Sequence, residues 1–306
     1  MGASLVKAIL VALLGLAMGT GAIGATGAPG ALSASSSPAC SGAAHGSWDH
    51  VIVIVMENHG FSQVAGHSPY LNGLARRCGI ARRYSGVAHP SLPNYMAMTS
   101  GRTFSSWSAS DCTAAPGCST DARSIFAQVK DWKAYEEHMT TDCQTSNDDA
   151  KHYAVRHNPP PYFTKISKAC AKNDVPLRAS SGGLVDDLAN GALPSFAFIT
   201  PDLRHDEHDA SVAVGDKWLH QWVPKILNSA TYKAGHTVLF ITYDESEGGS
   251  SNRVYTVVVA PSVKRHTVSR ARFNHYSMLK TWENMLGAKC LSHSCKAHSM
   301  AKAFGL

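Results

Sequence analysis

The strongest constraint on the fold is an unbroken apolar run at His50–Met56, in which five consecutive residues are valine or isoleucine. Apolar and polar residues do not alternate there, so the pattern is typical of a strand buried on both faces of a parallel sheet. Two similar runs occur at Pro194–Thr200 and Thr237–Tyr243, and Val254–Ala260 reads as a fourth strand. The chain is therefore predicted to be an α/β protein built on a mostly parallel sheet.

Carboxylates follow three of these strands. Glu57 and Asn58 come directly after the first run, Asp202 follows the second, and Asp244 and Glu245 follow the third. In open α/β sheets, ligands bind beyond the carboxyl ends of the strands. A hard divalent cation held by Glu57, Asn58, Asp244 and Glu245 suits this placement, because such ions prefer oxygen ligands. The alternative is that these residues form ordinary solvated loops.

A candidate nucleophile lies in the segment His89–Tyr95, which follows a strand predicted at Tyr84–Ala88. Pro93 suits the first residue of a helix, which puts Ser91 at or just before the helix N-terminus. Free backbone N–H groups and the helix dipole favour an anion there and would stabilise the alkoxide of a nucleophilic serine. The nearby cation would lower the pKa of the hydroxyl further. The alternative role for Ser91 is an ordinary helix cap.

Histidines and further carboxylates gather in two loops. The segment 202–209 reads DLRHDEHD, a density of ligand-type residues that favours metal binding or proton transfer over a plain surface loop. Arg156 and His157 could face a phosphate, although a histidine before a proline turn is often structural. His275 begins a helix predicted to extend to Met285, and the basic run 264–272 is interpreted as a solvated face.

The N-terminal region is typical of an exported chain. Residues 1–28 have a charged start at Lys7, an apolar core and small residues suited to cleavage, which predicts a signal peptide. Residues 29–47 resemble a flexible spacer, and 48–306 are interpreted as one domain. Eight cysteines in such a chain predict disulfides, although sequence alone leaves many pairings open. The preferred set is Cys112–Cys118, Cys290–Cys295, Cys143–Cys170 and, by elimination, Cys40–Cys78.

Several motifs in matching order resemble the phosphoesterase family that contains secreted acid phosphatases and phospholipases C. The layout is similar to that of short actinobacterial secreted acid phosphatases of the phosphatidylinositol-3-phosphatase type. The resemblance spans about 48–287 and departs from the family pattern at His59, Glu207 and Asn252. The last departure argues against a full two-zinc site. The motifs are Met56-Glu57-Asn58, His89 to Tyr95, Asp206 to Asp209 followed by Gly215 to Leu219, Thr242 to Glu245, and His275-Tyr276-Ser277.

This resemblance implies a three-layer α/β/α sandwich of the alkaline-phosphatase type and a secreted phosphomonoesterase. It implies a phosphoserine intermediate on Ser91 and a divalent metal cation of uncertain identity. The expected site residues are Ser91, His208 and His275 as catalytic groups, His89, Asn94, His157 and Asp206 as substrate-binding groups, and Glu57, Asn58, Ser91, Asp244 and Glu245 as metal ligands.

The resemblance implies a phosphate ester as partner, with a phosphoinositide or another anionic lipid headgroup as a candidate. The formal net charge of +6 favours anionic partners without naming one. We expect a secreted, extracellular monomer with no nucleic-acid partner and no stable membrane insertion. The runner-up activity is a phospholipase C of the same family, which would cut on the other side of the phosphate. A non-catalytic module that binds metal or anions is the alternative from a different class.

Overall fold

The computed structural model describes residues 39–306 except 179 and 248–250. These residues belong to a compact unit that spans Ser37–Leu306, and the description below concerns this unit alone. The predicted signal peptide, 1–28, and the first part of the predicted spacer, 29–38, lie outside the described residues.

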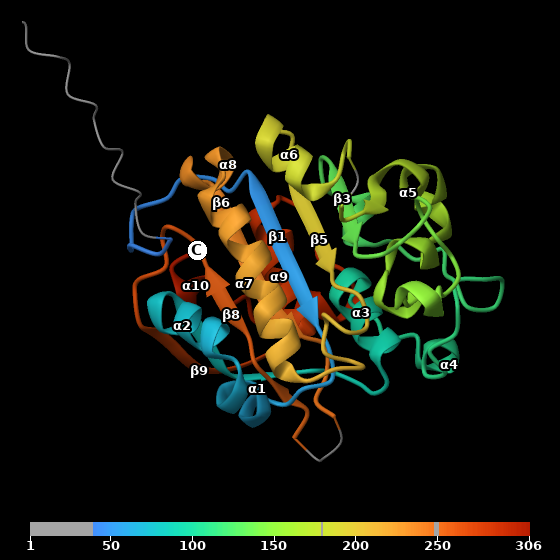
Figure 1. The fold of residues 1–306 in the computed structure, drawn as a ribbon, viewed down its shortest axis with the longest axis horizontal. Coiled ribbons are helices and arrows are strands. Elements are labelled where there is room, and N and C mark those ends of the chain that lie inside the picture. Colours follow the sequence, from blue (N-terminus) through green and yellow to red (C-terminus); the bar gives the residue numbers. More distant parts are fainter. Residues whose placement is uncertain (1–38, 179, 248–250) are drawn as a thin grey trace, which may run out of the picture. The chain divides into compact units, whose positions relative to one another are not determined.

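The described residues form a nine-stranded mixed sheet (Figure 1). Its hydrogen-bonded order is β4-β3-β5-β1-β6-β8-β2-β7, and β9 pairs with β2. Most of the pairings are parallel, whereas β8 runs antiparallel to β6 and β2, and β7 runs antiparallel to β2. The strands are β1 (His50–Met56), β2 (Gly79–Ser85), β3 (Trp132–Glu136), β4 (Asp174–Pro176), β5 (Phe196–Thr200), β6 (Thr237–Tyr243), β7 (Arg253–Val254), β8 (Val257–Val259) and β9 (Thr267–Asn274).

The three apolar runs form the centre of this sheet, as predicted. Strand β1 lies between β5 and β6 and runs parallel to both, and nearly every residue of the three strands is buried. Met56 pairs with Tyr243 at the end of the β1–β6 ladder. The residues that follow, Glu57 and Asp244, therefore leave the sheet side by side.

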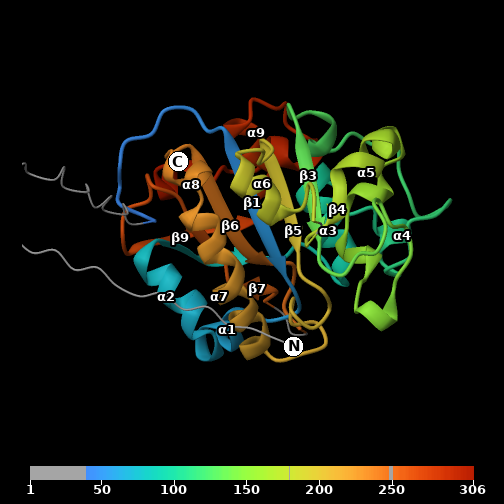
Figure 2. The same ribbon diagram turned by 45° about the horizontal axis from the view of Figure 1, so that its top comes forward.

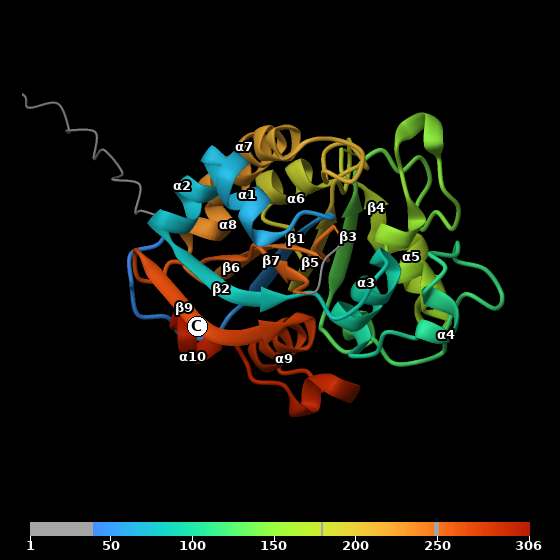
Figure 3. The same ribbon diagram turned by 90° about the horizontal axis from the view of Figure 1, so that it is seen from below.

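Helices cover both faces of the sheet, which confirms the three-layer α/β/α sandwich. Helices α1, α2 and α7 lie on one face, and α9 and α10 lie on the other, where α3 packs against α9 (Figure 3). The α-helices are α1 (Phe61–His67), α2 (Pro69–Arg77), α3 (Ser91–Ser100), α4 (Ser105–Ser108), α5 (Ser167–Asn173), α6 (Leu184–Asn190), α7 (Val212–Asn228), α8 (Ala230–Lys233), α9 (His275–Met285) and α10 (Ala301–Phe304). Short 3-10 turns occur at η1 (Ile125–Ala127), η2 (Asp149–Lys151), η3 (Val155–His157), η4 (Pro160–Tyr162), η5 (Thr164–Ile166) and η6 (Ser292–Lys296).

The segment with α4 and α5 lies beyond the β3 and β4 edge of the sheet (Figure 2). Helix α5 packs on β3 and β4 and thereby ties this excursion to the edge. Among the described residues, no helix has both the length and the apolar character needed to cross a membrane.

Three details differ from the sequence prediction. The strand predicted at Tyr84–Ala88 lies earlier, as β2, and ends at Ser85. The prediction was shifted because the exposed Arg82 and Arg83 interrupt the apolar pattern of this strand. The fourth apolar run is divided into β7 and β8 rather than continuous. The basic side chains of the run at 264–272 are exposed, as predicted, but from Thr267 onward the run belongs to a strand, β9, that pairs with β2.

All eight cysteines are paired in the preferred set: Cys40–Cys78, Cys112–Cys118, Cys143–Cys170 and Cys290–Cys295. Cys40 of the first pair lies in the described part of the predicted spacer, 39–47. Cys40 is buried, and the backbone N–H groups of Ser41 and Gly42 donate to Pro261 and Val263. A disulfide and a short hydrogen-bonded segment therefore hold this stretch against the domain.

Candidate active site

Ser91 and Glu57 meet where α3 begins beside the end of β1. Ser91 is the first residue of α3, so Pro93 occupies the third helical position and not the predicted first. The Ser91 hydroxyl is buried and donates a hydrogen bond of 2.8 Å to Glu57 Oε2. The second oxygen of Glu57 accepts a bond of 2.7 Å from the Tyr95 hydroxyl, one turn along the same helix. Helix α3 thus supplies both partners of the Glu57 carboxylate.

The predicted ligands from β6 lie beside this pair. Asp244 follows β6, and its Oδ1 accepts a 3.2 Å hydrogen bond from the backbone N–H of Asn58. Asn58 has φ of 61°, a left-handed conformation that asparagine tolerates better than most residues. Asp244 is fully buried and Glu245 nearly so. The structure therefore brings Glu57, Ser91, Asp244 and Glu245 together at the same edge of the sheet.

These carboxylates share a buried volume that favours the protonated state. Desolvation, followed by repulsion from Asp244 and Asp206, raises the pKa of Glu57 well above its ordinary value. Desolvation raises the pKa of Asp244 to about 7, and desolvation together with Asp244 raises that of Glu245 to about 9. Three buried carboxyl groups cannot all ionise cheaply unless a positive charge lies among them.

A divalent cation fits this donor set. Asp244 Oδ2 is buried and has no hydrogen-bond partner among the described residues, so an acceptor is available where a ligand oxygen is needed. Glu57, Asp244 and Glu245 supply oxygen donors, which hard divalent ions prefer. Compensation of the carboxylate repulsion gives a second reason for a cation at this position.

His157 and Asp206 extend the site on the side of β5. His157 is buried, its Nδ1 donates to Asp206 Oδ2 at 3.0 Å, and its Nε2 lies 3.4 Å from Glu57 Oε1 without forming a hydrogen bond. Desolvation, followed by repulsion from Arg156, holds the pKa of His157 well below its ordinary value. His157 is therefore a neutral imidazole with its free nitrogen aimed at Glu57.

His208 lies at the accessible edge of the same group. Single ligand atoms of Glu57, His157 and His208 lie within 4.8 Å of one another. Arg156 Nη2 donates to His208 Nε2 at 3.0 Å, and His208 Nδ1 donates to Asp209 at 2.6 Å. The guanidinium and the imidazole together offer an anion-binding group at the mouth of the site.

His89 and Asn94 hold the loop that leads into α3. His89 Nδ1 lies 2.5 Å from Glu245 Oε2, and the His89–Pro90 peptide bond is cis. Asn94 Oδ1 accepts from two backbone N–H groups of this loop, and its amide nitrogen donates to Ala88 O and Pro90 O. The Asn94 side chain is thus engaged with the protein, while His89 remains partly exposed.

His275 is buried with both ring nitrogens engaged. Its Nε2 donates to the backbone oxygen of Asp244, and its Nδ1 accepts from the Tyr84 hydroxyl at 3.0 Å. Desolvation lowers the pKa of His275 to about 4, so the ring is neutral at physiological pH. This geometry suits a residue that positions Asp244 better than one that touches a phosphoryl group.

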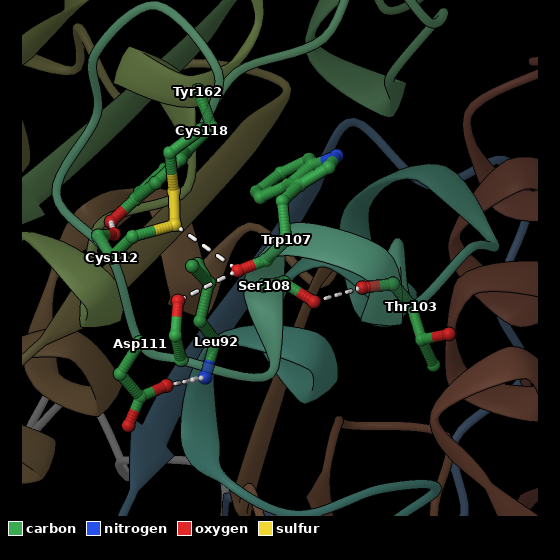
Figure 4. Close-up of a disulfide and its surroundings, with 9 residues drawn as sticks. Leu92, Thr103, Trp107, Ser108, Asp111, Cys112, Cys118 and Tyr162 are labelled. Carbon is green, nitrogen blue, oxygen red and sulfur yellow. Dashed lines mark hydrogen bonds between the residues drawn. A yellow bond between two sulfur atoms is a disulfide. The ribbon is translucent and has the colours of Figure 1, made fainter.

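Asp111 lies beside the start of α3, although no sequence pattern pointed to this residue. Its Oδ1 accepts the Leu92 N–H at 2.9 Å, next to Ser91, and its Oδ2 lies 3.7 Å from Arg156 Nε. The adjacent disulfide from Cys112 fixes this segment, and the Tyr162 hydroxyl donates to Cys112 O (Figure 4). Nothing in the local pattern of a loop rich in serine, threonine and cysteine distinguishes Asp111 from a surface turn.

A buried serine at a helix start, carboxylates at the ends of parallel strands and a neighbouring arginine form an arrangement that suits hydrolysis of phosphoric esters. The sequence model of the phosphoesterase family matches residues 68–288. The chain belongs to the phosphoesterase family, which places it among the hydrolases of phosphoric esters.

Relatives of known name agree with this assignment. The chain is 30% identical over 218 residues to an acid phosphatase of Aspergillus fumigatus, covering 67% of this chain and 48% of that protein. It is 27% identical over 259 residues to the phosphatidylinositol-3-phosphatase of Mycobacterium tuberculosis, covering 84% of this chain and 83% of that one. The chain thus spans about half the length of the fungal relative and most of the mycobacterial one.

Solved structures show the same fold. A protein of the alkaline phosphatase superfamily from Vibrio parahaemolyticus has a TM-score of 0.52 at 12% identity, covering 85% of this chain and 72% of that chain. A phosphonate monoester hydrolase from Silicibacter pomeroyi has a TM-score of 0.51 at 11% identity, covering 84% and 76%. At these identities the similarity concerns the fold alone, and it confirms the predicted alkaline-phosphatase-like architecture.

Proposed function

We propose that the protein is an exported, metal-assisted phosphomonoesterase that acts through a phosphoserine on Ser91. The observation that carries the proposal is the 2.8 Å hydrogen bond from the Ser91 hydroxyl to Glu57 at the start of α3, beside the unpartnered Asp244 Oδ2. A nucleophilic serine needs a proton acceptor and a field that stabilises its alkoxide. Glu57 supplies the acceptor, and the helix N-terminus contributes to the field.

The cation would be held by Glu57, Asn58, Asp244 and Glu245, and would supply positive charge that lowers the pKa of the hydroxyl and neutralises phosphoryl oxygens. Ser91 Oγ attacks phosphorus, and its proton passes toward Glu57. The bond between phosphorus and the ester oxygen breaks, and this oxygen leaves as part of the alcohol. Water then hydrolyses the phosphoserine and regenerates the hydroxyl. In this scheme the side chains of Ser91 and Glu57 act from the positions described above.

The rim residues take separate roles in this proposal. Arg156 and His208, 3.0 Å apart, bind the phosphoryl oxygens, and His208 also assists proton transfer to the leaving group or from water. The Asp206–His157 pair keeps the free His157 Nε2 beside Glu57, where it can accept a proton or a hydrogen bond, and His89 contacts the substrate from the exposed side. Asn94 and His275 are positioning residues, because their polar atoms are already bonded to the loop before α3 and to Asp244.

The substrate class proposed is a phosphate monoester on an anionic headgroup, with phosphoinositides included. The net charge of +6 favours anionic substrates, and the mycobacterial relative bears the name of a phosphoinositide phosphatase. Four disulfides are consistent with export, because such bonds persist in oxidising compartments.

One assay separates this activity from a phospholipase C. The same purified protein is given a phosphoinositide and phosphatidylcholine, and release of inorganic phosphate is compared with release of diacylglycerol. Phosphate from the first substrate without diacylglycerol from the second is the expected result. Diacylglycerol as the main product would assign the protein to the phosphodiesterase branch, and no product from either would favour a binding module.

Ser91→Ala tests the nucleophile directly. Loss of the hydroxyl removes one hydrogen bond to Glu57, worth about 1 kcal/mol, so the variant should fold and lose turnover on the order of a thousandfold or more. Ser100→Ala, at the other end of α3, is the matched control and should retain turnover. Rapid acid quench of the wild type with a labelled monoester should trap phosphate on Ser91. A Ser91→Ala variant within about tenfold of the wild type would leave Ser91 as a helix-start residue only.

A further inference from the structure

A second group of ligand-type side chains lies at the same edge of the sheet, on the far side of β5. Glu137 and His138 follow β3, and Asp202 and His205 come from the loop that follows β5. Strands β3 and β5 are parallel neighbours, and the Glu137 N–H continues their ladder by donating to Thr200 O. The ends of both strands therefore bring these four side chains together.

The four side chains face one another closely. His205 Nδ1 lies 2.9 Å from Glu137 Oε2 and 3.3 Å from Asp202 Oδ1, and His138 Nδ1 lies 2.7 Å from Asp202 Oδ2. Single ligand atoms of Glu137, Asp202 and His205 lie within 4.8 Å of one another. Such spacing is what a single ion needs if it is to replace the direct contacts with bonds of about 2.0–2.2 Å.

Burial distinguishes this group from a surface ion-pair cluster. The side chains of Glu137 and Asp202 are 0% and 2% exposed, whereas those of His138 and His205 are 43% and 35% exposed. The carboxylates thus form the floor of the group and the imidazoles its rim. The imidazoles are open to solvent, and the buried oxygens gain most from a positive charge.

Among the described residues, Arg178 is the only arginine or lysine within ion-pair distance of the two buried carboxylates. Arg178 Nη2 lies 3.3 Å from Glu137 Oε1, but half of its side chain is exposed. His205 Nδ1 faces both Glu137 Oε2 and Asp202 Oδ1, so positive charge at this position serves both carboxylates. A divalent ion supplies this charge when it displaces the proton from the imidazole nitrogen.

We propose that Glu137, Asp202 and His205, completed by His138, form a binding site for a divalent transition metal such as Zn²⁺ or Mn²⁺, separate from the carboxylates around Ser91. Two imidazole nitrogens with two carboxylate oxygens are a ligand set that these ions accept, and four ligands suit tetrahedral Zn²⁺.

The ion would fasten the loop after β5 to the end of β3. That loop also carries Asp206, which holds His157 toward Glu57, and His208, which contacts Arg156. The proposed site is therefore structural, because it would hold the loop that follows β5 in place from the side away from Ser91. It does not depend on the phosphatase proposal, because its ligands touch neither Ser91 nor the carboxylates beside it in the contacts described.

The test counts bound metal in a protein whose first site is disabled. Asp244→Asn removes a ligand of the catalytic group, and its disulfide-bonded protein is equilibrated with Zn²⁺, dialysed and analysed for metal by mass spectrometry. We expect one equivalent in Asp244→Asn and none in the double variant that adds His205→Gln. His220→Gln, an exposed histidine outside the group, is the matched control and should retain the equivalent.

Thermal unfolding gives a readout independent of activity. Zn²⁺ should raise the unfolding temperature of Asp244→Asn, and adding His205→Gln should abolish this rise. In chelator, where no metal is bound, His205→Gln should lower the unfolding temperature by less than the rise that it abolishes. Absence of bound metal in Asp244→Asn, with no thermal shift up to millimolar Zn²⁺ or Mn²⁺, would overturn the proposal and leave a metal-free ion-pair group. In that case His205→Gln would destabilise the protein equally with and without metal. A phosphatase result of either sign leaves this count unchanged.

Discussion

Glu207, in the loop that follows β5, provides a quantitative test of how burial changes the pKa of a carboxyl group in this protein. Its carboxyl is buried, Oε1 accepts a 3.0 Å hydrogen bond from the Tyr243 hydroxyl, and Oε2 has no partner among the described residues. It packs where Gly215 leaves space, since a Cβ at that glycine would lie 2.2 Å from Glu207 Oε1. Desolvation raises the pKa of Glu207 to about 9.

The sign of the pH effect follows from this raised pKa. The unfolded chain releases the Glu207 proton near pH 4.5, whereas the folded protein keeps it to about pH 9. Folding therefore takes up a proton in this window, and the contribution of Glu207 to stability falls as pH rises through it. The fall is about 1.4 kcal/mol per pH unit, or about 3 kcal/mol between pH 4.5 and pH 7.

Glu207→Gln removes this titration while it keeps the shape and an acceptor for Tyr243. We expect the variant to be within about 1 kcal/mol of the wild type at pH 4.5 and more stable by up to about 3 kcal/mol at pH 7. Urea unfolding of both proteins at several pH values measures the difference. Glu247→Gln, at an exposed position, is the control and should follow the wild-type profile. Parallel profiles for Glu207→Gln and the wild type would refute the reasoning.

Three further predictions concern the site and the disulfides. Asp244→Asn or Glu57→Gln should reduce turnover by more than about a hundredfold, because the cation loses a ligand, and near wild-type turnover under limiting metal would contradict the proposed ligand set. Tyr84→Phe removes the bond to His275 Nδ1 and should lower the free energy of unfolding by about 1 kcal/mol while turnover stays within about tenfold. A complete loss of turnover would instead give Tyr84 a catalytic role. Exported protein treated with iodoacetamide before reduction should gain no adducts on its eight cysteines, and full alkylation would exclude the disulfides.

The sequence by itself determined the centre of the sheet and the edge at which the candidate site lies. Continuous apolar runs fix β1, β5 and β6 as buried strands, because only a strand covered on both faces accommodates them. Once these strands are parallel neighbours, Glu57 and Asp244 must emerge side by side. Short-range patterns also predict a helix start close to Ser91 and the local disulfides, although they put Pro93 two residues too early in the helix.

Only the tertiary structure decided what the loop residues do. In the sequence, Asp202, His205 and His208 look alike, as ligand-type residues of one loop. In the fold, Asp202 and His205 lie against Glu137, whereas His208 lies near Glu57. The fold also places His275 in hydrogen bonds with the Tyr84 hydroxyl and the backbone oxygen of Asp244. It brings Asp111, from a disulfide-bonded loop, to the start of α3. The physical reason is range: burial patterns repeat along a few neighbouring residues, whereas the partner of a loop side chain is set by whichever element packs against it from elsewhere in the chain.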